Sequence, residues 1–217
     1  MEWQEVGGVE WVETSLRGAR VVFSTRSAGS MKEGHWLLAE ALGVAEERIV
    51  SGRQAHGAEL AVHDVPTRQT PVVDGHVMRR PGPIGLVYTA DCLPVAVAGP
   101  GGVAILHCGW RGLAAGIVAR GVEVVGATDA AVGPGVGPCC YEVGDEVLAA
   151  FSELGDTVAA GRLLDLTEVS RQLLRRAGVE RIDSEEICTS CNPELFFSHR
   201  RDGGPGRQAG LAWLEGG

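Results

Sequence analysis

The chain has 217 residues, 45% of them hydrophobic, and a formal net charge of −9 with scattered basic residues. This composition is typical of a globular protein with a sizeable core, so we expect a single domain over residues 1–217. Without a basic patch the chain has no long-range attraction for DNA, RNA or anionic lipid, and any anionic ligand has to be bound locally.

The first residues carry neither the basic stretch nor the apolar stretch of a secretion signal. No uninterrupted apolar run reaches the roughly 18 residues that a membrane span needs. We therefore expect a cytoplasmic protein without a membrane segment. Its six cysteines are then expected to be free thiols, metal ligands or a nucleophile rather than a disulfide framework.

The first part of the chain is predicted to combine short strands with one helix. Apolar, β-branched runs indicate the strands, and a glycine after the last apolar turn ends the helix. The Asp74-Gly75 pair is a turn signal at the end of the loop. In chain order, these predicted segments are a strand over 21–23, a helix over 35–42, strands near 48–50 and 58–62, and a loop over 63–75.

A β-hairpin follows, and its register carries most of the functional argument. Apolar runs over 84–88, 95–98 and 103–106 are strands, with a glycine-rich turn over 99–102. Counting back from that turn sets Pro94 opposite His107. Alternation then places Cys92 diagonal to His107, with Cβ atoms roughly 7 Å apart or less. Cys108 points to the other face, so the register selects His107 as the partner of Cys92.

The second half of the chain continues the mixture of helices and strands. Because the strands are interspersed with helices and joined in part by tight hairpins, we expect mixed rather than wholly parallel sheets. The predicted segments are a helix over 111–125, a strand over 130–134, helices over 142–154 and 166–177, and strands over 182–188 and 211–214.

A thiol and an imidazole on one face, beside the carboxylate of Asp91, suit either a nucleophile with its base or two metal ligands. His56, in the segment Gln54-Ala55-His56-Gly57, is the candidate third ligand. Two histidines and one cysteine would make a recognised catalytic zinc set with one open position. A histidine that only hydrogen-bonds within its loop is the alternative for His56.

Anion binding is predicted where the strand that ends at His107 meets the next helix, since free backbone N–H groups lie there. Arg111 would bind a phosphate there or pair with a structural carboxylate. Trp110 is expected to pack rather than to stack on a base. Further donors, or else solvated side chains, are Arg26, Arg200, Arg201 and Arg207.

The remaining cysteines allow two interpretations. Cys188 and Cys191 have the Cys-x-x-Cys spacing, and Cys139 and Cys140 are adjacent. All four together would make a structural zinc site. Because adjacent cysteines chelate poorly, the sequence favours small apolar residues that pack loops against the core.

Several motifs in a fixed order resemble the YfiH/YlmD family, long labelled laccase-domain or polyphenol oxidase proteins. The resemblance covers nearly the whole chain. It rests on Gln54-Ala55-His56-Gly57, Thr89-Ala90-Asp91-Cys92-Leu93-Pro94, His107-Cys108-Gly109-Trp110-Arg111-Gly112, the segment 133–144 with Gly137-Pro138-Cys139-Cys140-Tyr141-Glu142, and the segment 196–207 with Phe196-Phe197-Ser198-His199-Arg200-Arg201-Asp202-Gly203.

The resemblance implies an αββα-like sandwich with mixed sheets, of α+β class, and a zinc ion held by His56, Cys92 and His107. It also implies phosphorolysis of adenosine, inosine, guanosine and methylthioadenosine, and deamination of adenosine. Asp91 would be the general base or an orienting carboxylate, beside Cys92 and His107 in the catalytic group. Arg26 and Arg111 would contact the nucleoside or phosphate. The expected partners are purine nucleoside and phosphate, with no nucleic acid and no membrane, in a monomer or homodimer.

The chain departs from the family pattern after Arg26, where a long loop is missing before residue 54, and at Cys108, which replaces a small residue. These departures bear on substrate choice more than on metal binding. The alternative functions are a cysteine hydrolase or amidase acting on cell-wall precursors, a copper-dependent polyphenol oxidase, and a binding protein without turnover. The six histidines include no His-x-His pair, which disfavours multicopper chemistry.

Overall fold

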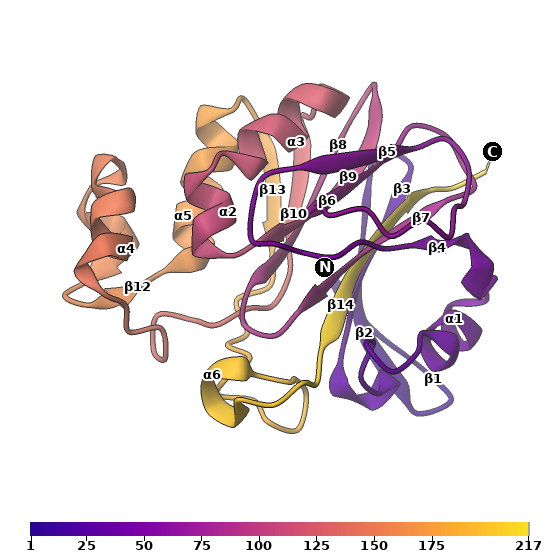
Figure 1. The fold of residues 1–217 in the computed structure, drawn as a ribbon, viewed down its shortest axis with the longest axis horizontal. Coiled ribbons are helices and arrows are strands. Elements are labelled where there is room, and N and C mark those ends of the chain that lie inside the picture. The colour runs from indigo at the N-terminus through magenta and orange to yellow at the C-terminus, as the bar shows by residue number, and fades with distance from the viewer. Residues whose placement is uncertain (217) are drawn as a thin grey trace.

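Two six-stranded sheets lie face to face at the centre of the computed structural model, which describes residues 1–216 (Figure 1). The order in the first sheet is β1 (Glu2–Val6), β2 (Val9–Leu16), β3 (Ala19–Ser24), β14 (Gln208–Leu214), β7 (Ile84–Thr89) and β4 (Ile49–Val50). The order in the second sheet is β13 (Arg181–Ser184), β10 (Asp129–Val132), β8 (Leu93–Gly99), β9 (Gly102–Cys108), β6 (Gly75–Met78) and β5 (Leu60–His63).

Both sheets are mixed, as predicted. The pairs β4 with β7, β5 with β6 and β10 with β13 are parallel, and the other pairs are antiparallel. A separate two-stranded sheet joins β11 (Ala159–Ala160) to β12 (Leu163–Leu164).

Helices cover the outer faces of both sheets, so the layers run α, β, β, α (Figure 1). One outer face carries α1 (Trp36–Leu42), and the other carries α2 (Trp110–Ala114), α3 (Ile117–Val125) and α5 (Leu166–Arg176). The short helices α4 (Asp145–Ala150) and α6 (His199–Asp202) lie in the long connections, and 3-10 turns occupy Arg26–Ala28, Glu46–Arg48, Ser152–Leu154 and Asp156–Val158. Among residues 1–216, no helix is long and apolar enough to cross a membrane.

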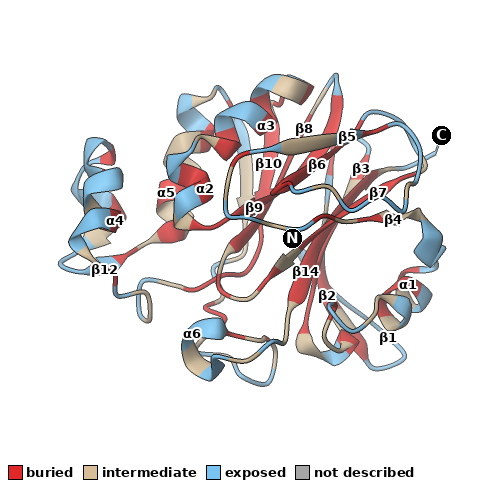
Figure 2. Cartoon of the chain, in the orientation of Figure 1, coloured by how far each residue is buried: buried red, intermediate tan, exposed pale blue. Residues whose placement is uncertain are grey.

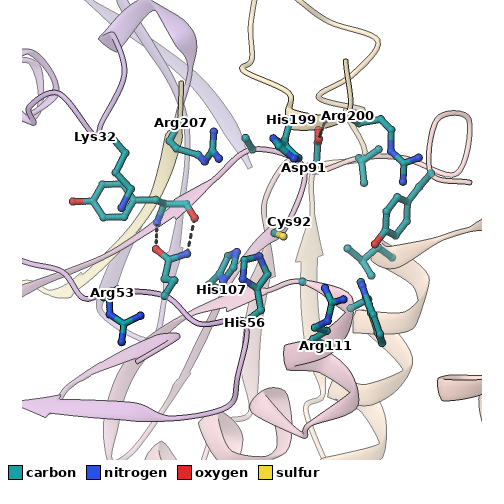
Figure 3. A pocket seen from close by; sticks show the side chains of 18 residues that line it. Lys32, Arg53, His56, Asp91, Cys92, His107, Arg111, His199, Arg200 and Arg207 are labelled. Atoms are coloured by element: carbon teal, nitrogen blue, oxygen red, sulfur yellow. Dashed lines mark hydrogen bonds between the residues drawn. The ribbon is translucent and has the colours of Figure 1, made fainter. Parts of the chain in front are cut away.

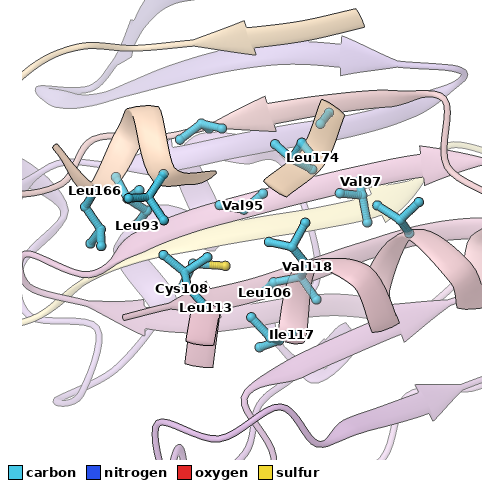
Figure 4. Packing of buried hydrophobic residues seen from close by; sticks show 14 of the residues in the cluster. Leu93, Val95, Val97, Leu106, Cys108, Leu113, Ile117, Val118, Leu166 and Leu174 are labelled. Atoms are coloured by element: carbon cyan, nitrogen blue, oxygen red, sulfur yellow. The ribbon is translucent and has the colours of Figure 1, made fainter. Parts of the chain in front are cut away.

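The core has three apolar clusters, one between the sheets and one under each helical layer. Phe23, Met78 and Ile105 belong to the cluster between the sheets. Figure 2 shows that the central strands are buried along most of their length. The hairpin of β8 and β9 is covered on both faces, because its side chains alternate between the inter-sheet cluster and the cluster under α3 and α5 (Figure 4).

The predicted hairpin register is confirmed, since Ala98 pairs with Val103 and Pro94 with His107. Pairing continues to Gly99 and Gly102, which shortens the turn to two residues without shifting the register. Gly102 is required here, because its φ is 123° and a Cβ atom would lie 2.3 Å from the Met78 carbonyl oxygen.

Other boundaries differ from the prediction. The helix expected over 111–125 is two helices, because Gly116 adopts the left-handed conformation with φ 85° between α2 and α3. The helix expected over 142–154 is reduced to the six residues of α4, and the strand expected over 182–188 ends at Ser184. The N-terminal hairpin of β1 and β2 has no counterpart among the predicted elements.

Candidate active site and metal centre

A cavity of about 430 Å³ lies at the open end of the β8–β9 hairpin, opposite its turn, where β8 begins and β9 ends. Figure 3 shows the side chains around it, with His56, Cys92 and His107 at its centre. The charged or potentially metal-binding residues of its wall are Lys32, Arg53, His56, Asp91, Cys92, His107, Arg111, His199, Arg200 and Arg207.

Three potential ligands converge in this cavity. One ligand atom from each of His56, Cys92 and His107 lies within 4.8 Å of the other two. The rings of the two histidines meet edge to face, with centroids 4.8 Å apart. The hairpin delivers two of these ligands, since Cys92 directly precedes β8 and His107 lies near the end of β9. The loop over residues 51–59 delivers the third.

A glycine at position 109 allows this convergence. A Cβ atom there would lie 2.9 Å from Cys92 Sγ and 3.3 Å from His56 Cδ2. Any other residue would therefore push apart two of the three ligands. This steric requirement explains why a glycine follows the His-Cys pair at the end of β9.

Asp74 holds two of the ligands in place. Its Oδ1 accepts hydrogen bonds from His107 Nδ1 at 2.9 Å and from the His56 backbone N–H at 2.9 Å. Its Oδ2 accepts from the backbone N–H groups of Ala55 at 3.0 Å and Gly57 at 2.8 Å. Because Nδ1 of His107 is engaged, Nε2 is the ring nitrogen left for a metal, the arrangement that commonly orients histidine ligands.

The four hydrogen bonds also keep Asp74 ionised. Burial tends to raise the pKa of this carboxyl, but the hydrogen bonds from His107, Gly57 and Ala55 outweigh burial and lower the pKa to about 2. The backbone of His56 has a positive φ of 59°, which is uncommon for residues other than glycine. The Asp74 carboxylate, by accepting from three successive N–H groups, stabilises that conformation.

Cys92 and His107 favour each other's charged form. Burial tends to raise the pKa of the Cys92 thiol, but the charge of His107 and hydrogen bonds from His107 and His56 lower it well below its usual range. Burial tends to lower the pKa of His107, but the charge of Cys92 and the hydrogen bond to Asp74 raise it. The thiolate form of Cys92 that results is the form required both of a metal ligand and of a nucleophile.

Gln54 anchors the ligand-bearing loop to the first sheet. Its Nε2 donates to the Tyr88 carbonyl at 2.8 Å, and its Oε1 accepts from the Tyr88 N–H at 2.8 Å. These two bonds, dashed in Figure 3, copy the pairing of one β-strand residue with another. They fix His56, two residues further on, relative to the strand that leads to Asp91.

Asp91 links the hairpin to two distant loops. Its Oδ1 accepts from Thr189 Oγ1 at 2.7 Å, and its Oδ2 accepts from the Arg200 N–H at 2.6 Å. The side chain lies in the cavity wall and is 8% exposed, and the backbone has φ 87°. One carboxylate oxygen therefore positions Arg200 in the cavity wall, and the other holds the loop that carries Thr189.

The cavity is strongly cationic although the chain is acidic. Five lysine and arginine side chains line it against one carboxylate, that of Asp91. In the view of Figure 3, Lys32, Arg53 and Arg207 lie on one side of the ligand cluster, and Arg111 and Arg200 lie on the other. This imbalance favours an anionic ligand.

Aromatic rings support three of these cations. Lys32 Nζ lies 3.9 Å from the centroid of the Tyr88 ring, and the guanidinium of Arg111 lies 4.5 Å from that of Trp110. Arg200 is placed in the same way over Tyr141, at 5.3 Å. Such contacts orient the cationic groups without neutralising them.

Of the other candidate arginines, two line the cavity and two do not. Arg26 lies in a different hollow, where it stacks on Phe197 at 4.5 Å and pairs with Asp202 at 3.4 Å. Arg201 also pairs with Asp202, so two of the four further donors are engaged in the loops around α6. Arg200 and Arg207 do line the cavity.

Sequence reasoning missed several residues of the site. The sequence marks Asp74 only as part of a turn, since no spacing in the chain relates it to His107. Gln54 was part of a motif without a stated role. Tyr141 and His199 also belong to motifs without a stated role, and no signal in the sequence marks Lys32, Arg53 and Tyr88 as cavity residues.

The geometry thus defines a class of protein: an αββα sandwich with a candidate metal centre of two histidines and one cysteine at the base of a cation-lined cavity. The family described as multi-copper polyphenol oxidoreductase laccase matches residues 25–215. The chain therefore belongs to this family, that of the YfiH and YlmD proteins.

Two relatives and one solved structure illustrate the similarity. Purine nucleoside phosphorylase SCO2081 of Streptomyces coelicolor is 36% identical over 98% of this chain and 93% of its own length. Purine nucleoside phosphorylase YfiH of Escherichia coli is 36% identical over 74% of this chain and 72% of its own. The crystal structure of YlmD from Geobacillus stearothermophilus superposes with a TM-score of 0.83 at 29% identity and covers 99% of both chains.

Proposed function

We propose that this chain is a zinc-dependent purine nucleoside phosphorylase that acts on adenosine, inosine, guanosine and methylthioadenosine, and that it also deaminates adenosine. The observation that carries the proposal is the cationic wall on an acidic protein: five cationic side chains against one carboxylate around the His56, Cys92 and His107 cluster. The names of the relatives support the same activity.

Phosphorolysis requires an anion held next to the ribose. A phosphate oxygen forms a bond to C1′ while the bond from C1′ to the purine nitrogen breaks, and the purine takes up one proton in exchange for the one that the hydrogen phosphate gives up. The guanidinium groups of Arg111 and Arg200 would hold the phosphate, since each can donate two parallel hydrogen bonds to its oxygens. Charge stabilisation of this kind acts most strongly in an enclosed cavity.

The remaining wall would bind the nucleoside and exclude water. Tyr88, Trp110 and Tyr141 offer apolar ring surface close to the cations. Asp91 would position Arg200 through the backbone N–H that it accepts, and in this proposal acts as an orienting group. Lys32 and Arg53, on the opposite side of the ligand cluster, would contact the ribose hydroxyls or the base.

The residues present fit zinc. One thiolate and two imidazoles are a known catalytic zinc set, and the hydrogen bond from His107 to Asp74 is the expected support for such a ligand. Zinc held by His56, Cys92 and His107 would supply a Lewis acid. The same donors also suit copper. Metal analysis of the purified protein distinguishes the two.

A thiol hydrolase is the second candidate, because Cys92 and His107 favour the thiolate and imidazolium forms of each other. In that case Cys92 would be a nucleophile and His107 its base. A thiolate that binds zinc is not free to attack. The two functions therefore predict opposite effects of zinc loading on activity.

The deciding experiment incubates zinc-loaded protein with each nucleoside, with and without phosphate. We expect free base and ribose 1-phosphate only when phosphate is present, and ammonia from adenosine independently of phosphate. Arg80→Ala, at an exposed position away from the cavity, is the matched control for arginine variants in the wall. Base release at the same rate without phosphate would indicate a hydrolase, and no release by fully loaded protein would refute the proposal.

A further inference from the structure

Four cysteines outside the nucleoside cavity come together at one point. Cys139 and Cys140 lie in the loop after β10, and Cys188 and Cys191 lie in the loop after β13. Their four Sγ atoms all lie within 4.8 Å of one another. No step of the proposed reaction uses these side chains.

The expectation that these cysteines pack as small apolar residues is wrong for most of them. Cys139 and Cys191 are exposed, Cys140 is half-buried, and only Cys188 is buried. The turn in which Cys140 N–H donates to the Gly137 carbonyl at 3.0 Å directs the two adjacent sulfur atoms to the same point. Adjacency therefore does not prevent both from binding one ion.

The distances between sulfur atoms fit a shared metal ion better than a disulfide. Cys191 Sγ lies 3.5 Å from that of Cys139 and 3.4 Å from that of Cys140, well beyond the S–S bond of about 2.05 Å. Four sulfur atoms around a tetrahedral zinc ion with Zn–S bonds of about 2.3 Å are about 3.8 Å apart. The cluster needs only small side-chain adjustments to reach that geometry.

The backbone and a nearby arginine suit a cluster of thiolates. The Gly137 N–H donates to Cys188 Sγ at 3.2 Å, a hydrogen bond that stabilises negative charge on sulfur. Arg201 Nη1 donates to the carbonyls of Thr189 at 2.9 Å and Ser190 at 3.1 Å, between Cys188 and Cys191. The guanidinium, which also pairs with Asp202, thereby holds the backbone between Cys188 and Cys191 in place.

We propose that Cys139, Cys140, Cys188 and Cys191 form a second, structural zinc site, separate from the cluster of His56, Cys92 and His107. Four thiolate ligands and no open position are typical of structural zinc. The ion replaces the thiol protons, which are released to solvent on binding. The proposal does not depend on the proposed catalytic function.

Such an ion would stabilise one wall of the nucleoside cavity. Tyr141, which follows Cys140 directly, lies in that wall. Thr189, which follows Cys188, donates to Asp91 at 2.7 Å. The zinc would join the two loops that carry these residues, so its loss should loosen the wall as well as the loops.

The test is zinc content per chain in the full-length protein, purified with zinc and freed of unbound metal. We expect about two zinc ions in the unchanged protein, about one in Cys191→Ser, and about one in His107→Ala. Cys191 is exposed, so the serine variant should fold, and Cys139→Ser, also exposed, serves as an independent variant. Cys108→Ala is the matched control and should keep both ions, because the Cys108 side chain packs in the apolar core and belongs to neither cluster.

Cobalt substitution identifies the ligands. In His107→Ala, the remaining cobalt should show the intense sulfur-to-cobalt charge-transfer bands of a four-thiolate site, and Cys191→Ser should lose them. Equal zinc content in Cys191→Ser and the unchanged protein would overturn the proposal. A disulfide from Cys191 to Cys139 or Cys140, in freshly purified protein without zinc at the four cysteines, would also overturn it. One zinc that Cys191→Ser loses and His107→Ala keeps would support the second site and refute zinc at the first.

Discussion

Replacing Asp74 by asparagine should weaken both the fold and the metal centre. The carboxylate accepts four N–H hydrogen bonds, two on each oxygen, from His107 and from three successive backbone groups beginning at Ala55. An asparagine has only one oxygen, so two of the four donors would face its NH₂ group. Each hydrogen bond to a buried charged group contributes about 1.5–3 kcal/mol, and the loss of two should cost about 3–6 kcal/mol.

For a chain of this length, each kcal/mol lowers the melting temperature by about 2–4 °C, so Asp74→Asn should melt at least about 6 °C lower. Metal affinity should fall about 10- to 100-fold, because the orienting partner of a histidine ligand is lost. Calorimetry and competition with a chelator measure the two effects. Asp64→Asn, an exposed carboxylate in the loop after β5, is the matched control. A variant at position 74 with unchanged melting temperature and metal affinity would refute the role assigned to Asp74.

Three further substitutions test the cavity. Cys92→Ser should lose most of the metal bound beside His107, whereas the control Cys108→Ala should keep it because the Cys108 thiol is buried under the helices. Metal analysis with the reverse outcome would contradict the assigned ligands. Asp91→Asn should keep the backbone conformation, since asparagine tolerates a φ of 87°. With a single oxygen, however, asparagine cannot accept the hydrogen bonds from Thr189 and Arg200 on two separate oxygens, so kcat should fall at constant metal content. An unchanged kcat would show that the carboxylate is dispensable. Arg111→Ala should raise the KM for phosphate about ten- to hundred-fold, as expected for the loss of one charge-assisted contact, and the KM for nucleoside less. An equal increase in both KM values would show that Arg111 is not specific for phosphate.

The sequence was most informative where local rules determine geometry. A turn flanked by apolar runs determined the hairpin register, and alternation along its strands then separated His107 from Cys108. The glycine after α1 was also predictable, because Gly43 has the left-handed conformation expected at a helix end.

Other features depend on contacts between distant segments. Asp74 receives its role from a loop and a strand that only the folded chain brings together, so a turn signal was all that the sequence could provide. Arg26 follows a strand, as expected, but it stacks on Phe197 and lines a different hollow. The break at Gly116 was missed because the apolar spacing continues on both sides of it. The exposed β1 carries no buried face that a pattern could indicate.

The double covering of the β8–β9 hairpin has a consequence for motion in the cavity. Amide groups in strands buried on both faces exchange with solvent only through large unfolding events, whereas exposed loops open locally at small free-energy cost. His107, in β9, therefore belongs to the slowest-exchanging part of the chain, and the segments that carry His56, Tyr141 and Arg200 belong to faster-exchanging parts. We expect hydrogen exchange to be slow in the hairpin at the base of the cavity and faster in the segments that form its walls. Local opening of those segments would let substrate enter and product leave without unfolding the hairpin that carries Cys92 and His107.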